Sequence, residues 1–350
     1  AFRNERLLGL ERELVRRSDD LLEALAADLG KPSLEAYVSE VFFSIAEVRL
    51  FLKKLPRWAK PKRVGNPFYY LPARSEVRSE PFGSTLIVAP WNYPIQLSLS
   101  PLIAAVAAGN TVLLKPSELA PASSAILAEI IHAVFNPQHV AVVEGGAELG
   151  KELLKESFDF WFYTGSERVG RLYGEAAARD LASITLELGG KCPVVVADDA
   201  PMAQTVERIV ANKFFNAGQT CIAPDFVLVP SHRHNAFVEA AKEALEAAYG
   251  DEAKSDLARM VNRGHYDRVH SLIPSDAIRI GQDDPDDLFL APTLVPLSEW
   301  EAPCMQEEIF GPALPIVPYH ALDEDLACLS RMPSPHALYV FSLRQDFLEA

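Results

Sequence analysis

Residues 86–115 read LIVAPWNYPIQLSLSPLIAAVAAGNTVLLK, and this stretch decides the fold. It opens with the short apolar run Leu86–Ala89, continues through an apolar segment that ends at Ala108, and closes with the second short run Val112–Leu114. Short apolar runs on either side of a longer helical segment predict a strand, a crossover helix and a second strand parallel to the first.

The same alternation continues along the chain and predicts an α/β fold with a doubly wound parallel sheet. Downstream of this stretch we expect a helix after Pro121 and strands at 140–143 and 158–163. A second α/β stretch begins with the run at 193–196, followed by a helix ending near Phe215, a strand after Cys221 and a helix over 234–247. Upstream, residues 6–54 predict helices, one of them ending at Gly30 and the next starting near Ser33. After the proline-rich residues 56–72, the polar alternation of Glu76, Arg78 and Glu80 predicts an exposed strand, which we interpret as an oligomer edge.

Composition and charge exclude several classes of function. The chain has 350 residues, with 33 Lys and Arg against 48 Asp and Glu, a formal net charge of −15. This acidic balance argues against nucleic-acid binding. No apolar stretch reaches the roughly 18–20 residues of a membrane span, and no signal peptide is visible. The four cysteines show no paired spacing, and the histidines form no zinc motif, so we expect neither disulfides nor a metal site, and a cytoplasmic location.

Cys221 is the best nucleophile candidate, because it lies between a glycine turn and a strand-like run. Attack of a thiolate on a carbonyl carbon requires a donor for the developing oxyanion and, where water completes the reaction, a base. Asn92, in a turn after a buried strand, is the candidate donor together with the backbone N–H of Cys221, although an asparagine here is also an ordinary turn former. Glu187, at the end of a β-branched run, is the candidate base, although Glu-Leu-Gly-Gly is equally a strand ending in a tight turn.

Several motifs occur in one order along the chain: Pro90–Pro94, Lys115–Glu118, Tyr163–Gly170, Glu187–Lys191, Gly218–Cys221 and Glu307–Pro312. Together they closely resemble the motifs of the aldehyde dehydrogenase family over essentially the whole chain. The variants Trp-Asn-Tyr-Pro and Cys-Ile-Ala-Pro-Asp resemble the class 3 branch, which includes fatty and aromatic aldehyde dehydrogenases.

The resemblance implies a domain organisation. We expect a Rossmann-like NAD(P)-binding domain over 1–187, with part of an oligomerisation arm near 66–85, and an α/β catalytic domain over 188–350. Members of the family continue beyond the equivalent of Ala350, so the catalytic domain is expected to be incomplete at its C-terminal end. The resemblance also implies a homodimer.

The resemblance assigns cofactor contacts as well. Gly165, Ser166 and Gly170 form a strand-to-helix turn that would contact the pyrophosphate; on its own this spacing is as consistent with a helix cap. Lys115 and Glu118 would bind the adenosine ribose, and Glu308 the nicotinamide ribose with Phe310 beside the ring, while Trp91 and Leu188 would complete the cofactor site. Without the family, Lys115–Glu118 would be a capped helix start and Glu308–Gly311 a loop with a core anchor. Because Glu118 repels a 2′-phosphate, NAD is expected to be preferred over NADP.

The expected reaction is oxidation of an aldehyde to a carboxylic acid through a cysteine thiohemiacetal and thioester, which water activated by Glu187 hydrolyses. Trp91, Tyr93 and Phe214 predict an apolar funnel for medium-chain or aromatic aldehydes. Cys192, Cys304 and Cys328 are expected to be buried structural thiols, and Lys191 is either an anion partner or a solvated lysine. Two alternatives remain: a catalytically impaired chain that binds dinucleotide or a partner subunit, and a cofactor-free cysteine hydrolase.

Overall fold

The chain forms two compact units in the computed structural model, which describes residues 2–250 and 253–349. The first unit comprises Ala1–Asp28 and Ala36–Glu187, and the second comprises Leu29–Glu35 and Leu188–Ala350. Residues 29–35, which the predicted first domain included, therefore lie in the second unit. Their backbone explains why, because Arg259 donates its N–H to the carbonyl of Leu29.

The first unit is built on a five-stranded sheet in the order β5-β4-β3-β6-β7. Its strands are β3 (Ser84–Val88), β4 (Thr111–Lys115), β5 (Val140–Val142), β6 (Phe160–Gly165) and β7 (Ser183–Leu188). β3 pairs in parallel with both β4 and β6, and β4 pairs in parallel with β5. The chain runs outward from β3 to β5 and then returns to the other side of β3, so the order reverses between β3 and β6. Ligands of open α/β sheets bind outside the carboxyl ends of the strands at such a point.

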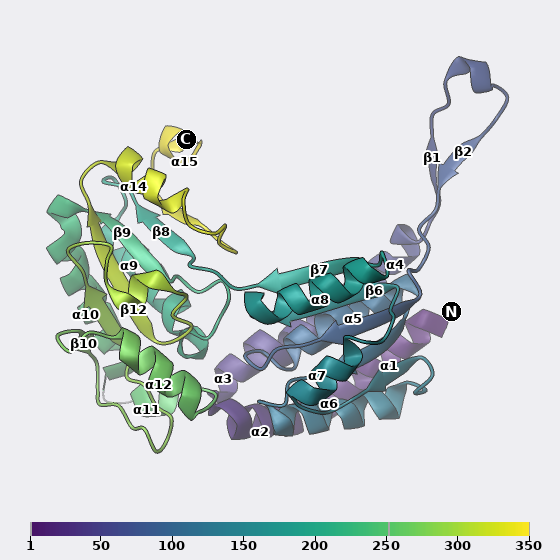
Figure 1. Ribbon diagram of the computed structural model, residues 1–350, viewed down its shortest axis with the longest axis horizontal. Helices are drawn as coiled ribbons and strands as arrows, with labels where there is room; N and C mark the ends of the chain where they lie inside the picture. The colour runs from purple at the N-terminus through teal and green to yellow at the C-terminus, as the bar shows by residue number, and fades with distance from the viewer. Residues whose placement is uncertain (1, 251–252, 350) are drawn as a thin grey trace. The chain divides into compact units, whose positions relative to one another are not determined.

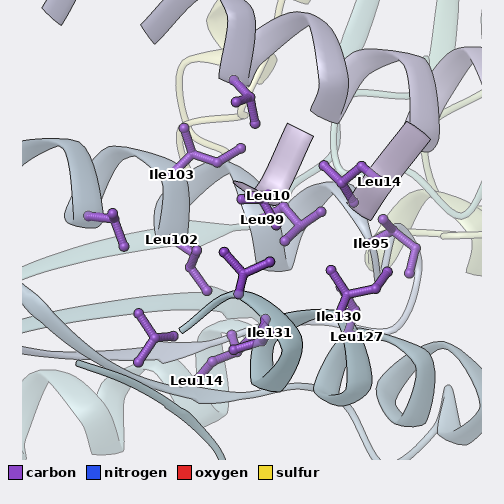
Figure 2. Close-up of a cluster of buried hydrophobic side chains, with 14 of the residues drawn as sticks. Leu10, Leu14, Ile95, Leu99, Leu102, Ile103, Leu114, Leu127, Ile130 and Ile131 are labelled. Atoms are coloured by element: carbon purple, nitrogen blue, oxygen red, sulfur yellow. The ribbon is translucent and has the colours of Figure 1, made fainter. Parts of the chain in front are cut away.

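Helices bury the apolar side chains of this sheet. The unit contains α1 (Phe2–Arg16), α2 (Ser18–Leu29), α4 (Phe43–Trp58), α5 (Gln96–Ala108), α6 (Pro121–Val134), α7 (Ala147–Leu153) and α8 (Glu167–Arg179). Figure 2 shows the core that forms between α1, α5, α6 and β4, with Leu10, Leu99, Leu114 and Ile131 among its members. This continuous core explains why the segment ending at Ala108 is apolar around most of its circumference.

The second predicted helix starts at Ser33 as α3 (Ser33–Ala36), widens into a π-helical turn over Tyr37–Phe42, and continues as α4. Beyond α4 a two-stranded antiparallel hairpin, β1 (Lys62–Val64) and β2 (Ser75–Val77), projects from the unit (Figure 1). Every residue of both strands is exposed, as the polar alternation near Glu76 predicted.

The second unit contains a six-stranded sheet in the order β10-β11-β12-β9-β8-β13. Its strands are β8 (Pro193–Val196), β9 (Phe226–Pro230), β10 (Ile278–Arg279), β11 (Thr293–Pro296), β12 (Ala313–Tyr319) and β13 (Tyr339–Phe341). Neighbouring strands of this sheet pair in parallel, except for the antiparallel pair of β10 and β11. The interior strands β8 and β9 are buried at every position, as expected for a parallel sheet covered on both faces.

The helices of the second unit are α9 (Met202–Phe214), α10 (His234–Tyr249), α11 (Ala253–Asp256), α12 (Arg263–Leu272), α13 (Pro303–Gln306), α14 (Leu322–Leu329) and α15 (Gln345–Glu349). α9 and α10 pack on one apolar cluster and α12 on another. Within the described residues, no helix combines the length and apolarity needed to cross a membrane.

Candidate active site and cofactor site

Cys221 lies in a constrained loop between α9 and β9. After α9 ends at Phe214, Asn216, Ala217 and Gly218 take left-handed backbone conformations with φ of 53°, 51° and 72°. Left-handed non-glycine residues cost roughly 1–3 kcal/mol each and concentrate at functional sites. Gly218 is required, because a Cβ there would overlap the carbonyl oxygen of Gly311. The loop thus presents the Cys221 side chain, which is partly exposed, in a fixed position.

Hydrogen bonds from buried side chains fix this loop from both sides. Gln219 is fully buried; its amide donates to the carbonyls of Asn216 (3.1 Å) and Arg259 (2.9 Å) and accepts from the N–H of Val261 (3.1 Å). On the other side, the carbonyl of Cys221 accepts a hydrogen bond from the Cys192 thiol at 3.3 Å. The loop therefore has little freedom to move its nucleophile.

The other thiols differ from Cys221 in exposure. Burial raises the pKa of Cys192 to about 11, and burial also raises the pKa of Cys304. Both are buried, as the sequence predicted, and are poor nucleophiles because the thiolate is the reactive form. Cys328 was predicted to be buried, and this prediction is wrong: it is exposed on α14.

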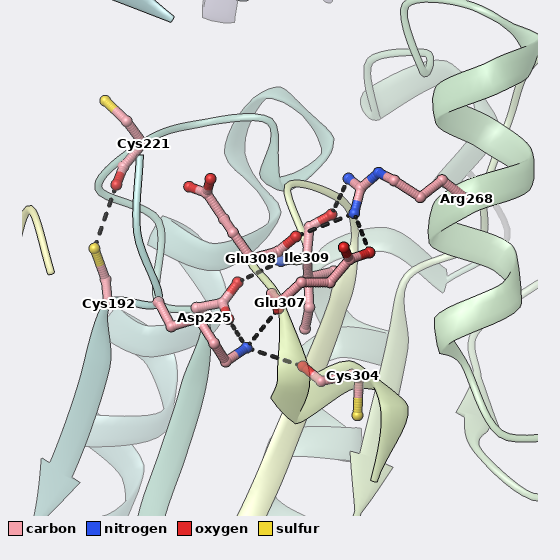
Figure 3. Close-up of polar contacts among 9 residues, drawn as sticks. Cys192, Cys221, Asp225, Arg268, Cys304, Glu307, Glu308 and Ile309 are labelled. Atoms are coloured by element: carbon pink, nitrogen blue, oxygen red, sulfur yellow. Dashed lines mark hydrogen bonds and ion pairs between the residues drawn. The ribbon is translucent and has the colours of Figure 1, made fainter. Parts of the chain in front are cut away.

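Glu308 lies against the turn that follows β7. Burial raises the pKa of its carboxyl to about 7, while a hydrogen bond from the backbone of Gly190 opposes that rise. A Cβ at Gly189 would overlap the Glu308 carboxylate, so this close approach requires glycine. Phe310, two residues further on, is partly buried and has a left-handed φ of 49°. Figure 3 shows Glu308 and Cys221 on separate loops of the second unit.

Lys191 is an anion partner and not a solvated lysine. Its ammonium pairs with Asp225, and the two side chains are only 11% and 4% exposed. The same ammonium donates to the carbonyls of Cys304 and Glu307, both at 2.9 Å.

Asn92 is almost completely buried in the loop that follows β3. The helix after this loop is anchored by Glu40, a fully buried carboxylate in the π-helical turn. Glu40 Oε2 accepts hydrogen bonds from the N–H groups of Ile95 (2.8 Å) and Gln96 (3.3 Å), at the start of α5. A carboxylate at a helix N-terminus satisfies amides that have no partner within the helix.

Lys115 and Glu118 lie together at the carboxyl end of β4. Lys115 is 5% exposed, and its ammonium contacts the Glu118 carboxylate at 2.8 Å. Burial, the largest single effect, opposes ionisation of Glu118, but the hydrogen bond from Lys115, a backbone hydrogen bond and the charge of Lys115 together outweigh it and hold the pKa of Glu118 below its usual value. An ionised carboxylate beside a buried ammonium therefore faces the carboxyl edge of the parallel sheet.

The turn at residues 165–170 joins β6 to α8. Gly165 ends β6, Ser166 is the residue before the helix, and its side chain makes no capping hydrogen bond. The first N–H groups of α8, beside the buried Gly170, are thus oriented at the switch point of the sheet, where a helix N-terminus suits a pyrophosphate. These groups, with Lys115 and Glu118, fit the phosphates and a ribose of a dinucleotide.

Glu187 is the last residue of the first unit, and the main segment of the second unit begins at Leu188. Both belong to β7 and are partly buried, and the carbonyl of Leu188 lies 3.0 Å from His336 Nδ1. The first unit thus carries Asn92, Lys115, Glu118, Gly165, Ser166, Gly170, Glu187 and the partly buried Trp91. The second unit carries Leu188, Cys221, Glu308 and Phe310.

One predicted lining residue lies elsewhere. Phe214 is fully buried in a core of the second unit, with its ring 6.0 Å from that of Tyr249, so it does not line an apolar funnel as predicted. Sequence reasoning also missed Glu40, Asp225 and Lys213. Lys213 on α9 is completely buried, and burial lowers its pKa to about 8 despite the nearby Asp225. For Glu40 and Lys213 the only signal was a charged side chain among apolar residues; Asp225 ends the Cys-Ile-Ala-Pro-Asp motif, but the sequence analysis gave it no role.

The family model described as "Aldehyde dehydrogenase family" matches residues 1–347. Among curated proteins, 4,4'-diaponeurosporen-aldehyde dehydrogenase of Staphylococcus aureus is 42% identical over 347 residues, which cover 98% of this chain and 76% of that protein. Human aldehyde dehydrogenase family 3 member B1 is 43% identical over 345 residues, covering 97% of this chain and 74% of that protein. Relatives in family 3 confirm the resemblance to the class 3 branch.

Solved structures agree in fold. A substrate-bound structure of Staphylococcus aureus AldH has a TM-score of 0.97 and 40% identity, covering 99% of this chain and 77% of that one. An NAD+ complex of a Mycobacterium tuberculosis aldehyde dehydrogenase has a TM-score of 0.87 and 25% identity, covering 99% of this chain and 74% of that one. The chain belongs to the aldehyde dehydrogenase family and is an oxidoreductase that acts on aldehydes.

Proposed function

We propose that this chain oxidises an aldehyde to a carboxylic acid with NAD+ or NADP+ as acceptor, through a covalent intermediate on Cys221. The observation that carries the proposal is the Cys221 loop: it holds a partly exposed thiol next to the buried Cys192, whose pKa is raised, on a backbone with successive left-handed residues. A fixed nucleophile reduces the entropy lost when substrate and thiol meet.

The Cys221 thiolate attacks the aldehyde carbon and forms a thiohemiacetal. The oxygen that gains negative charge accepts hydrogen bonds from the Asn92 side-chain amide and the Cys221 backbone N–H. Donors held in place before the reaction stabilise such charge most effectively. The burial of Asn92 and the anchoring of the following helix by Glu40 support this role.

A bound NAD+ or NADP+ supplies the hydride acceptor that turns the thiohemiacetal into a thioester. In our proposal the first turn of α8, with Ser166 between Gly165 and Gly170, holds the pyrophosphate. Lys115 and Glu118 hold the adenosine ribose. Glu308 accepts hydrogen bonds from the nicotinamide ribose, Phe310 lies beside the ring, and Trp91 and Leu188 complete the cofactor contacts.

Glu187 completes the cycle as a general base. It takes a proton from water, the resulting hydroxide adds to the thioester carbon, and the C–S bond breaks to release the carboxylic acid and the Cys221 thiolate. The net reaction converts aldehyde, oxidised cofactor and water into acid, reduced cofactor and a proton.

NAD is the proposed preferred cofactor. The ionised Glu118 beside the ribose opposes the 2′-phosphate of NADP, and Lys115 already pairs with Glu118 at 2.8 Å, which limits how far it attracts that phosphate.

The proposed substrate is a medium-chain aliphatic or aromatic aldehyde. The partly buried Trp91, next to Asn92, supports an apolar approach to the thiol, whereas Tyr93 is buried. The Staphylococcus aureus relative is named for 4,4'-diaponeurosporen-aldehyde. We also propose a cytoplasmic homodimer, with the exposed β1–β2 hairpin as part of its interface.

The direct test replaces the nucleophile. Cys221→Ala is expected to lower formation of reduced nicotinamide, followed by absorbance with an apolar aldehyde, by roughly 1,000-fold or more, because no covalent intermediate forms. Affinity for the cofactor is expected to change little. Cys328→Ala, which removes an exposed thiol, is the matched control and should keep full activity.

If Cys221→Ala oxidised the aldehyde as fast as wild type, another group would have to be the nucleophile. A wild-type protein that binds dinucleotide but oxidises no aldehyde would instead favour the catalytically impaired chain.

A further inference from the structure

Lys191 joins segments that are far apart in the sequence. A lysine ammonium has three N–H donors, and the Lys191 ammonium has three acceptors: the Asp225 carboxylate and the carbonyls of Cys304 and Glu307. Lys191 follows the Gly189-Gly190 turn. Cys304 lies in α13, and Glu307 is the first residue after it. The side chain therefore ties the turn after β7 to the segment that precedes β12.

Asp225 reaches the same segment from another side. It lies between Cys221 and β9, and its own N–H donates to the carbonyl of Cys192 at 2.8 Å. Its Oδ2 pairs with Lys191, while its Oδ1 accepts the N–H of Ile309 at 3.0 Å. Both carboxylate oxygens are thus used, one on each of two segments (Figure 3).

These contacts bracket Glu308. The carbonyl of Glu307, on one side, is held by Lys191, and the N–H of Ile309, on the other, is held by Asp225. The side chain of Glu308 then reaches back onto the Gly189-Gly190 turn, where it accepts a hydrogen bond from Gly190. The position of the Glu308 carboxylate therefore depends on the backbone that the pair fixes.

The energetics favour a positioning role over a stabilising one. A buried ion pair often contributes no more stability than apolar residues of the same volume, because desolvation of the charges offsets their attraction. Arg268 also donates to this segment, at the carbonyls of Glu308 (3.1 Å) and Ile309 (2.7 Å), but it leaves the Glu307 carbonyl and the Ile309 N–H to Lys191 and Asp225.

We propose that the Lys191–Asp225 pair is a positioning pair, which sets the Glu308 carboxylate for contact with the dinucleotide. The inference rests on the proposed function only in assigning Glu308 to the cofactor. Neither Lys191 nor Asp225 needs to touch the substrate or the cofactor in this role.

The test is a double-mutant cycle on NAD+ binding, measured by titration calorimetry without aldehyde. We expect the Kd for NAD+ to rise about tenfold in Lys191→Met and about tenfold in Glu308→Gln. Because the first change acts through Glu308, the double variant should bind no more weakly than either single variant. Effects that multiply to roughly 100-fold would overturn the proposal.

Controls separate positioning from general destabilisation. Lys155→Met removes an exposed pair with Glu152 and should leave the Kd within about twofold of wild type. The calorimetric stoichiometry reports the folded fraction in each variant, so a change in Kd at unchanged stoichiometry is not a folding defect. If Lys191→Met does not fold, Asp225→Asn replaces it in the cycle, since it keeps the shape and an acceptor for Ile309 but removes the charge that holds Lys191.

The outcomes distinguish this inference from the proposed function. If Glu308→Gln binds NAD+ more weakly while Lys191→Met binds it as tightly as wild type, the positioning pair is refuted and the contact of Glu308 with the cofactor still stands. If the Kd for NAD+ is unchanged in Glu308→Gln, the cofactor contact itself is refuted, and the positioning pair with it. Because the titration contains no aldehyde, its result does not depend on whether the chain oxidises aldehydes.

Discussion

At the scale of single residues, the environment of each group gives it a different chemical character. The thiols Cys192 and Cys304 are buried and have raised pKa values, whereas the Cys221 thiol is partly exposed. Among the carboxylates, Glu118 is kept ionised by Lys115, while burial raises the pKa of Glu308 to about 7. The sequence motifs predict roles for Cys221, Glu118 and Glu308. They could not show the charge state of any of these residues, because neighbours distant in the chain set it.

The pair of Glu118 with Lys115 leads to a prediction on cofactor choice. Glu118→Gln should lower the ratio of kcat/KM for NAD+ to that for NADP+ by about tenfold, because it removes a repulsion of about 1–4 kcal/mol from the 2′-phosphate. Steady-state kinetics with both cofactors measure this ratio. Glu129→Gln, which alters an exposed pair with Arg17, is the matched control. An unchanged ratio in Glu118→Gln would mean that the ribose is bound elsewhere.

At the scale of helices and strands, local patterns predicted most elements. The apolar runs at 86–89, 112–114 and 193–196 became β3, β4 and β8 because short apolar runs in this alternation pack as parallel strands. The π-helical turn at Tyr37–Phe42 had no such pattern. Its geometry accompanies the burial of Glu40, whose partners are amides at the start of α5. Likewise β13 pairs with β8, and that pairing depends on tertiary packing and not on local sequence.

The hairpin gives a prediction at this scale. Phe68 and Tyr70, in the short helix between β1 and β2, are 83% and 61% exposed, and apolar side chains at such exposure favour an interface. We expect wild type to sediment as a dimer at micromolar concentration and Phe68→Ser/Tyr70→Ser to sediment as a monomer. The control Leu181→Ser changes an apolar residue that is 93% exposed elsewhere. If wild type is a monomer, or if the hairpin variant is still a dimer, the hairpin does not form the predicted interface.

At the scale of the whole molecule, the proposed roles are divided between two units with separate cores. Asn92 and Glu187 belong to the first unit, and Cys221 and Glu308 to the second, with the boundary directly after Glu187. The motif order in the sequence is what assigns these roles, and they remain predictions. The sequence did not predict the contacts that hold the set in place, such as Lys191 with Asp225, because each joins segments that only folding brings together.

The central claim, a thioester on Cys221 that Glu187-activated water hydrolyses, is tested most directly by rapid mixing of Glu187→Gln with aldehyde and NAD+. We expect a burst of about one equivalent of NADH per Cys221, followed by turnover that is slower than wild type by about 100-fold or more, because the thioester forms but water is not activated. Turnover at the wild-type rate would contradict the role of Glu187 as the base. Loss of both burst and turnover in a folded variant would contradict the proposed order of steps.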